Sequence, residues 1–345
     1  MSLQNRAAWL MAKESPMFTV DSAPHTTPSV NEVVIKTKAI AINPADAIYL
    51  KSVMLLKDYP AILGCDVAGE VVEVHPSLAE DYSVGDRVIA QGGAAYRRDG
   101  TYCYSTFQEY VVVRAARMTK IPQHVAYEDA VVLPLGMVTA LACLFMDQTL
   151  ALPWPLEHGE KPGQGKTLLV WGASSSVGSC GVQLAVHAGY EVVGIASKRN
   201  HEMVKGLGAT ACFDQSDPNL VEDIVQSLKG KAVMGAYDAI HDDETLNTLC
   251  EILDKINDRR LIASISPGAE AKGTRGVKIV TNFAAIGVES DIPKLVWQWI
   301  HRAMENKTIK YMPRSEVVGK GLEDLQKAVE LLGQGVSAKK LVVSI

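Results

Sequence analysis

The first third of the chain alternates short apolar runs with turn residues, a pattern typical of β-structure. It predicts strands at residues 32–39, 67–74 and 107–113, and a Gly-Asp turn followed by a strand within residues 82–90. At residues 32–39 apolar and polar positions alternate, which predicts a strand at an exposed sheet edge. Few positions repeat at the helical period, so residues 1–133 are expected to form a β-rich, barrel-like domain.

The pattern changes after a Pro- and Gly-rich segment between Met146 and Lys166. Strand-like runs are then expected at residues 167–171, 191–196, 211–214, 237–241, 261–265 and 277–280. Helical runs are expected between them at residues 177–188, 201–207, 220–228 and 244–256. This alternation predicts an α/β domain over residues 134–304, with the doubly wound parallel sheet of the Rossmann type.

The tail predicts a helix at residues 321–332 and a final strand at residues 340–345. The strand is expected to rejoin the first domain. Residues 1–133 and 305–345 are therefore predicted to form one substrate-binding and catalytic domain, and residues 134–304 the cofactor-binding domain.

Composition narrows the function classes. The 345 residues are 48% hydrophobic and 21% charged, as in globular proteins, and the net charge of −5 offers no basic field to nucleic acid or an anionic membrane. The N-terminal apolar run is too short for a signal peptide, and the apolar stretch at residues 130–146 is broken by Pro134 and Gly136. The six cysteines are widely spaced, which indicates free thiols and a cytoplasmic location.

A phosphate-binding turn is predicted at residues 168–178, where a buried strand runs into a Gly- and Ser-rich turn and a helix. The motif departs from the usual glycine pattern, because only the last glycine remains. Small residues there let backbone N–H groups approach a pyrophosphate. The residues expected to contact the cofactor are Ala173, Ser174, Ser175, Ser176, Val177 and Gly178.

The end of the second expected strand indicates which nicotinamide cofactor binds. An NAD site places Asp or Glu there, whereas this chain has Ser197, Lys198, Arg199 and Asn200. Two cations and an amide suit a 2′-phosphate, so NADP(H) is predicted as the cofactor. The alternative is a solvated basic turn without a ligand.

Seven motifs in order along nearly the whole chain resemble the medium-chain dehydrogenase/reductase superfamily, and within it the zinc-free quinone oxidoreductases and the fungal trans-acting enoyl reductases. They are AINPAD (41–46), LGCDVAGE (63–70), VGDRV (84–88), FQEY (107–110), LPLGMVTA (133–140), GASSSVG (172–178) and VSAKKLVV (336–343). The resemblance implies a GroES-like N-terminal domain joined to a Rossmann domain.

The resemblance also implies that no metal is bound. Related zinc-dependent alcohol dehydrogenases carry Cys in the segment matching residues 42–46 and Gly-His-Glu at the positions of residues 64–66. This chain has Asn43, Cys65 and Asp66 there. A catalytic zinc needs three protein ligands, which this set does not supply, and Cys65 is expected to be a small buried residue.

Without a metal, another group must polarise the substrate and supply a proton. Tyr49 matches a tyrosine that follows the Asn-Pro motif in the quinone oxidoreductases, and its phenol is expected to donate the proton. Two alternatives stay open: solvent as the donor, and a Tyr49 that only packs in a loop. Ile48 stands where some enoyl reductases carry Lys. Asn43, with Pro44 beside it, is expected to hold the nicotinamide ribose or the substrate oxygen.

Further residues follow from the resemblance. Thr139, Ile265 and Ser266 are expected beside the nicotinamide half of the cofactor, and Lys339 near the cofactor as well. The alternatives are a threonine that only starts a helix and a lysine that is only solvated at the surface. The loop at residues 91–105 carries tyrosines among glycines, a composition suited to an adaptable lid over an apolar ligand or to a plain surface hairpin. Its tyrosines are Tyr96, Tyr102 and Tyr104.

Together these features predict an NADPH-dependent reductase that transfers a hydride to the activated C=C bond of an enone, an alkenal or an enoyl thioester. The acyl group is either free or bound to a carrier protein. Two alternatives stay open: an NADPH quinone oxidoreductase, and a non-catalytic NADPH-binding accessory protein. The chain is expected to be a monomer or a homodimer.

Overall fold

The computed structural model describes residues 4–13, 15, 17–51, 56, 58–93, 95–156, 159–240, 242–285 and 290–345, without the side chains of residues 49–51. The chain divides into two compact units. The first unit comprises residues 1–135 and 297–345, and the second comprises residues 136–296. The sequence placed these boundaries after residues 133 and 304.

The first unit is built on two β-sheets. A seven-stranded sheet has the order β15-β16-β3-β5-β6-β8, with β7 also paired to β3, and a three-stranded sheet has the order β2-β1-β4. The strands are β1 (Asn5–Leu10), β2 (Thr19–Ala23), β3 (Glu32–Ala41), β4 (Ala61–Ile62), β5 (Asp66–Val74), β6 (Arg87–Gln91), β7 (Tyr110–Arg114), β8 (Met118–Lys120), β15 (Arg314–Lys320) and β16 (Lys339–Ser344).

Strand β3 is central, so the expected exposed edge at residues 32–39 is wrong. β3 pairs with β5, β7 and β16, and apart from Lys36 and Lys38 its residues are buried. The alternation in the sequence came from these two lysines alone. Two lysines in the middle of a long strand therefore do not show that the strand lies at an edge.

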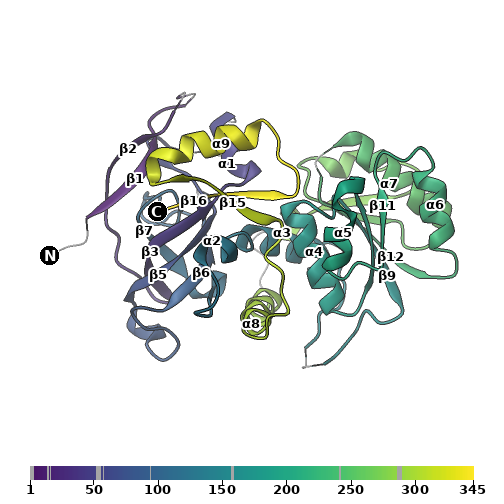
Figure 1. Ribbon diagram of the computed structural model, residues 1–345, viewed down its shortest axis with the longest axis horizontal. Coiled ribbons are helices and arrows are strands. Elements are labelled where there is room, and N and C mark those ends of the chain that lie inside the picture. Colours follow the sequence, from purple (N-terminus) through teal and green to yellow (C-terminus); the bar gives the residue numbers. More distant parts are fainter. Residues whose placement is uncertain are drawn as a thin grey trace. The chain divides into compact units, whose positions relative to one another are not determined.

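The C-terminal segment returns to the first unit, as the sequence predicted (Figure 1). β16 runs antiparallel to β3, with Val342 opposite Ala41. The helix before it, α9 (Leu325–Gly333), packs against α1 (Pro44–Lys51). Buried apolar residues from the helices and strands form one core there. The short helix α2 (Tyr127–Ala130) also lies in this unit, whereas α3 (Pro134–Leu144) and α8 (Ile292–Glu305) cross the unit boundaries.

The second unit contains the predicted doubly wound sheet. Six parallel strands have the order β11-β10-β9-β12-β13-β14. Successive strands are added outward from β9 on one side and outward from β12 on the other, so the strand order reverses between β9 and β12. The strands are β9 (Lys166–Trp171), β10 (Glu191–Ala196), β11 (Ala211–Asp214), β12 (Ala232–Asp238), β13 (Leu261–Ser264) and β14 (Lys278–Thr281). In such sheets ligands bind beyond the carboxyl ends of the strands at this reversal.

Helices cover both faces of that sheet (Figure 1). α6 (Leu220–Ser227) and α7 (Asp243–Ile256) bury apolar side chains on one face, and α4 (Ser176–His187) lies on the other, followed by α5 (His201–Gly206). β12 begins at Ala232, earlier than the sequence placed it, and Gly235, with φ +96°, lies at an irregularity in its pairing with β9. Residue 241, the expected strand end, lies outside the described residues.

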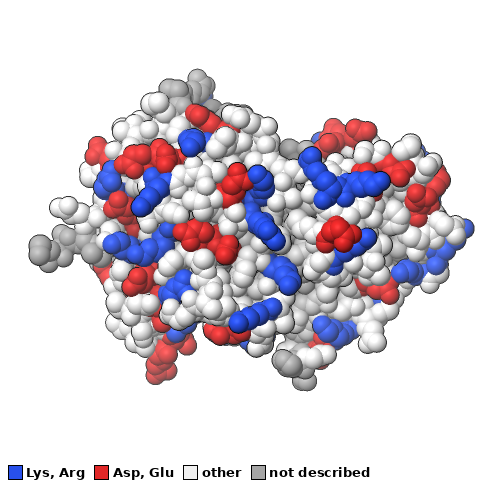
Figure 2. Space-filling model, viewed as in Figure 1, with Lys and Arg blue, Asp and Glu red and all other residues white. Residues whose placement is uncertain are grey.

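One segment among the described residues, Tyr127–Leu144, has the length and apolar composition that a membrane-crossing helix needs, and 61% of it is buried inside the protein. Core helices of folded domains meet the same criteria. On the surface, acidic and basic side chains are interspersed over the face shown in Figure 2.

Candidate active site

Five polar side chains are buried together in the first unit, around the start of α1, the start of β5 and strand β16. We name them the polar cluster: Asn43, Asp46, Cys65, Asp66 and Lys340. None is more than 6% exposed, and both carboxyl groups are fully buried. Buried charges are costly unless they are paired and hydrogen-bonded, so the contacts within the cluster determine its protonation.

An ammonium group lies at the centre of the polar cluster. Lys340 Nζ is 3.1 Å from Asp66 Oδ2 and donates a hydrogen bond to Asn43 Oδ1. Asn43 Nδ2 also donates to Asp66 Oδ2, at 2.8 Å. The other oxygen of Asp66 accepts the backbone N–H of Leu135 at 2.7 Å. Asp66 therefore contacts one cation and accepts two hydrogen bonds, which fix its carboxyl group in place.

Asp46 behaves differently from Asp66. Its Oδ2 accepts the backbone N–H of Asn43 at 2.8 Å, which fixes the turn into α1. Burial raises the pKa of Asp46 to about 7, and the charge of Asp66 adds to this, while the Asn43 N–H and Lys340 oppose it. Burial also raises the pKa of the Cys65 thiol, which stays protonated. The cluster thus contains one carboxyl group, that of Asp46, able to gain or lose a proton near neutral pH.

The polar cluster does not fit a catalytic zinc ion. Zinc is held by Cys, His or carboxylate ligands about 2.0–2.3 Å away. Here the shared oxygen of Asp66 already accepts from an amide and contacts an ammonium, and Asn43 Oδ1 accepts from the same ammonium. The described residues include no group of three or more His, Cys, Asp or Glu placed to hold a metal.

Lys340 was missed by the sequence analysis, and Lys339 was chosen in its place. Lys339 is more than half exposed and forms an ion pair with Glu316, so it does not fit a cofactor contact. Neighbouring residues of a strand point to opposite faces, and one face of β16 here is the core. The adjacent lysines were a signal that one of them is buried.

Three more of the expected site residues, Asn43, Pro44 and Tyr49, lie at or in α1. Both ends of the Asn43 amide are engaged inside the cluster, so Asn43 positions Asp66 and Lys340 and does not present a free amide to ribose or substrate. Pro44 is exposed at the start of α1. The backbone of Tyr49 lies in α1, but its side chain is outside the described part of the structure, so its role as proton donor stays a prediction.

The turn predicted to bind phosphate leads from the end of β9 into α4. Ser175 caps α4, its side chain accepting the N–H of Gly178 at 3.0 Å. A Cβ on Gly178 would stand 2.1 Å from the carbonyl oxygen of Gly172, so only glycine lets the helix approach the end of β9. Ala173 is buried, and Ser174, Ser175, Ser176 and Val177 are partly exposed around the positive end of the helix dipole.

The basic turn after β10 is tied to the phosphate-binding turn. Asn200 Nδ2 donates to Ser174 Oγ at 3.1 Å, while Lys198 and Arg199 are exposed and Ser197 is half-buried. Asp214, at the end of the neighbouring strand β11, has a lowered pKa because Ser216 and the Lys198 N–H hydrogen-bond to it. That carboxylate holds the turn in shape.

A buried carboxylate that the sequence analysis missed organises the ends of β12 and β13. Asp238 accepts from Ser264 Oγ at 2.6 Å and from the Ile240 N–H at 3.0 Å. The Ser266 N–H in turn donates to Ser264 Oγ at 3.0 Å, which fixes the backbone at Ile265 and Ser266. Both expected residues therefore lie at the carboxyl edge of the sheet. Thr139 is half-buried on α3.

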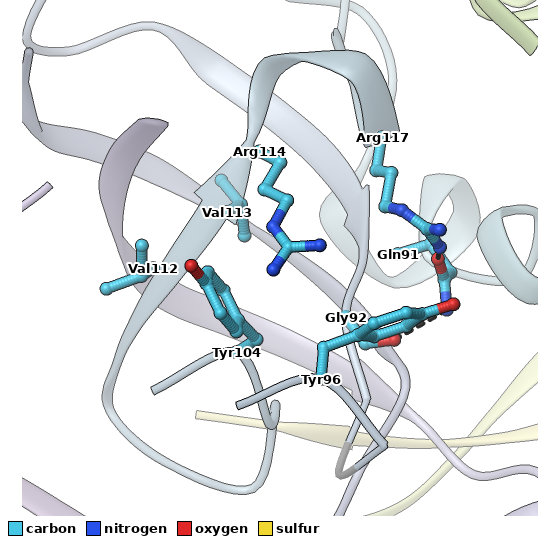
Figure 3. Close-up of a pocket in the computed structure, with 8 residues that line it drawn as sticks. All are labelled: Gln91, Gly92, Tyr96, Tyr104, Val112, Val113, Arg114 and Arg117. Carbon is cyan, nitrogen blue, oxygen red and sulfur yellow. Dashed lines mark hydrogen bonds between the residues drawn. The ribbon is translucent and has the colours of Figure 1, made fainter. Parts of the chain in front are cut away.

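The expected lid at residues 91–105 is wrong for two of its three tyrosines. Tyr102 and Tyr104 are 5% exposed, and their hydroxyls donate to the Asp58 carbonyl and the Glu32 carboxylate. They pack as structural residues. Tyr96 is half-buried and lines a small pocket with Tyr104 and two arginines (Figure 3), whereas Tyr102 lines a separate cavity of about 290 Å³.

Comparisons with known proteins agree with this architecture. Residues 29–123 match the alcohol dehydrogenase GroES-like domain, and residues 176–282 match the zinc-binding dehydrogenase family. The dehydrogenase pigH of Monascus ruber is 36% identical, with 99% of each chain covered. The trans-enoyl reductase himH of Aspergillus japonicus is 33% identical, covering 100% of this chain and 98% of its own.

Among solved structures, the CurK enoyl reductase has a TM-score of 0.76 at 18% identity, with 99% of each chain covered, which shows a shared fold. The chain belongs to the medium-chain dehydrogenase/reductase superfamily. It is accordingly an oxidoreductase of the kind that binds a nicotinamide cofactor.

Proposed function

We propose that this protein is a zinc-free, NADPH-dependent reductase of activated C=C bonds, acting in the cytoplasm on an enone, alkenal or enoyl group. The observation that carries the proposal is the buried ammonium of Lys340, which engages the oxygens that a metal would need. Relatives named trans-enoyl reductases support the choice of a C=C bond over an alcohol.

The cofactor would be held by the second unit. The backbone of residues 173–178 and the dipole of α4 suit the pyrophosphate, and Lys198, Arg199 and Asn200 suit a 2′-phosphate. When bound, the nicotinamide supplies the hydride. The chain's own part is to orient the reactants and to stabilise the negative charge that develops on the substrate carbonyl oxygen.

The polar cluster contributes charge and a proton reservoir. Lys340 and Asn43 hold the Asp66 carboxyl group in place, and Asp46 can exchange a proton near neutral pH. The α-carbon must gain one proton for each hydride that the β-carbon receives. We propose Tyr49 of α1 as the donor, with solvent as the other source.

The test is turnover with a panel of substrates. NADPH oxidation is followed with a simple enone, a crotonyl thioester and a quinone, each also with NADH, and the purified protein is assayed for zinc. We expect reduction of the enone and the thioester with NADPH, no stoichiometric zinc, and no loss of activity with a chelator. Reduction of the quinone alone would favour a quinone oxidoreductase. Cofactor binding without turnover would favour the accessory protein.

A further inference from the structure

We propose that Arg114 and Arg117 form an oxyanion site that binds a carboxylate or phosphate carried by the substrate. The inference rests on the proposed function and adds a substrate class to it: unsaturated carbonyl compounds with a negatively charged tail. Arg114 ends β7, and Arg117 ends the 3₁₀ turn Ala115–Arg117 that follows. Both side chains reach the same small pocket (Figure 3).

Aromatic rings hold both guanidinium groups. The Cζ atoms of Arg114 and Arg117 lie 5.5 and 4.3 Å from the centre of the Tyr96 ring, and Arg114 Cζ is also 4.2 Å from the centre of the Tyr104 ring. Stacking against a ring occupies the flat face of a guanidinium and leaves its N–H edge for hydrogen bonds. The two arginines are thus pre-organised, which reduces the entropy lost when a ligand binds.

The acidic side chain beside Arg114 is already engaged by other residues: Glu32 lies opposite Arg114 in the β3–β7 pairing, but its carboxylate is paired with Arg98 and accepts from the Tyr104 hydroxyl. Two other arginines of the same region form ion pairs, Arg97 with Asp58 and Arg98 with Glu32. No ion pair involves Arg114 or Arg117 among the residues that the structure describes, and Arg117 donates instead to the neutral Gln91 side chain. A guanidinium fork without a carboxylate is the group that proteins use to bind carboxylate and phosphate in two-bonded geometry.

The pocket lies next to the polar cluster within the first unit. Gln91, one of its lining residues, is directly opposite Asp66 in the β5–β6 pairing. The ring of Tyr96 and Cys65 Sγ both lie 3.7 Å from the point where a Cβ on Gly93 would stand. Only about 10 Å³ is enclosed, the space of one water molecule, so the oxyanion would bind at the mouth of the pocket.

The inference is tested with matched pairs of substrates that differ only in the negative charge. One pair is a short unsaturated keto acid and its methyl ester, and the other is crotonyl-4′-phosphopantetheine and crotonyl-pantetheine. The two pairs distinguish a carboxylate from a phosphate as the natural group. In the reaction the β-carbon gains a hydride from NADPH, the α-carbon gains a proton, and NADP⁺ is released.

We expect the wild-type protein to prefer the charged member of at least one pair. Arg114→Gln and Arg117→Gln should each lower that preference, measured as a ratio of kcat/KM values, by about tenfold to a hundredfold. Arg117→Lys should restore part of it, because the charge stays but the fork is lost. Arg97→Gln is the matched control: it removes one positive charge from the loop that carries Tyr96, where Arg97 is paired with Asp58, and the preference should stay.

Equal losses with the charged and neutral members would overturn the inference, as would the absence of any preference in the wild-type protein. Binding is also measured by calorimetry, with the saturated keto acid and with 4′-phosphopantetheine as unreactive probes. If no enone is reduced, the proposed function fails, yet calorimetry still decides the oxyanion site. Binding that is unchanged by both arginine substitutions would contradict it.

Discussion

At the scale of single residues, two adjacent lysines of β16 lie in opposite environments, one buried and one exposed. Lys340 is 3% exposed and bound to Asp66 and Asn43, while Lys339 is at the surface with Glu316. A buried ion pair adds little net stability, but removing one partner leaves the other charge buried and uncompensated. The consequences of removing each lysine should therefore differ greatly.

Lys340→Met should destabilise the first unit by about 3–5 kcal/mol, because Asp66 loses its cation while it stays buried. Lys339→Met, the matched control, removes an exposed pair and should change the stability by less than about 1 kcal/mol. Urea unfolding of both variants measures the difference. Similar stabilities of the two variants would show that Asp66 does not depend on Lys340.

Asp46 gives the first unit a distinctive pH dependence. The pKa of the Asp46 carboxyl is about 7 in the folded protein, whereas its ordinary value, 3.8, applies in the unfolded chain. Between about pH 4 and pH 7 the folded form therefore keeps a proton that the unfolded form has lost. The contribution of Asp46 to the free energy of unfolding therefore falls as pH rises through this window, by a few kcal/mol in order of magnitude, and is constant above it. Asp46→Asn cannot ionise and keeps an acceptor for the Asn43 N–H.

We expect the difference in stability between wild type and Asp46→Asn to change steadily from pH 4 to pH 7, with the wild type losing relative stability as pH rises. Denaturant titrations at several pH values measure it. Exposed carboxylates with lowered pKa values, such as Asp214 and Glu222, act in the opposite direction, but they cancel in this comparison. A pH-independent difference would mean that Asp46 is ionised throughout.

At the scale of elements, the phosphate-binding turn depends on one glycine. Gly178→Ala should weaken NADPH binding and destabilise the second unit, because the new Cβ would overlap a backbone oxygen that cannot move aside. Gly206→Ala is the control: the site has open space around it in α5 and an ordinary backbone conformation, so this variant should be as stable as the wild type or slightly more. Thermal unfolding with and without NADPH compares them.

The basic turn after β10 should set the cofactor preference. Lys198→Glu places a carboxylate where a 2′-phosphate would bind, and we expect the preference to reverse from NADPH to NADH. Each charge-assisted hydrogen bond to that phosphate is worth about 1.5–3 kcal/mol before desolvation. Dissociation constants of both cofactors, measured for wild type and variant, provide the check. Equal constants in the wild-type protein would remove the basic turn from cofactor selection.

The elements of the second unit were the most predictable part of the fold. Strands and helices there are contiguous in sequence, and each has a local signal, such as the glycine turn of residues 172–178. The first unit was harder to predict. The central position of β3 and the burial of Lys340 depend on pairings between distant residues, which a local pattern does not contain. The pocket between Tyr96, Arg114 and Arg117 could likewise not be predicted from the sequence, because its aromatic and basic residues come from separate segments.

At the scale of the whole molecule, one unit is continuous in sequence and the other is not. Residues 136–296 form the second unit, whereas the first needs residues 297–345 to complete its large sheet. Deleting residues 339–345 removes β16, which lies between β15 and β3. We expect the first unit of this variant to become sensitive to protease while the second stays resistant in the presence of NADPH. Fragment mapping by mass spectrometry measures this, and equal resistance of both units would contradict it.

The long sequence separation within the polar cluster also has a consequence during synthesis. Lys340 contacts Asn43 across 297 positions of the chain. On the ribosome, the segments that carry Asn43 and Asp66 emerge early, and the Asp66 carboxylate lacks this internal cation until translation has reached β16. A chain whose translation stops before that strand contains the two turns predicted to hold the cofactor and most of the β-strands, but it lacks the lysine that completes the polar cluster. Completion of the polar cluster thus depends on translation of β16, whose Lys340 lies 297 positions after Asn43.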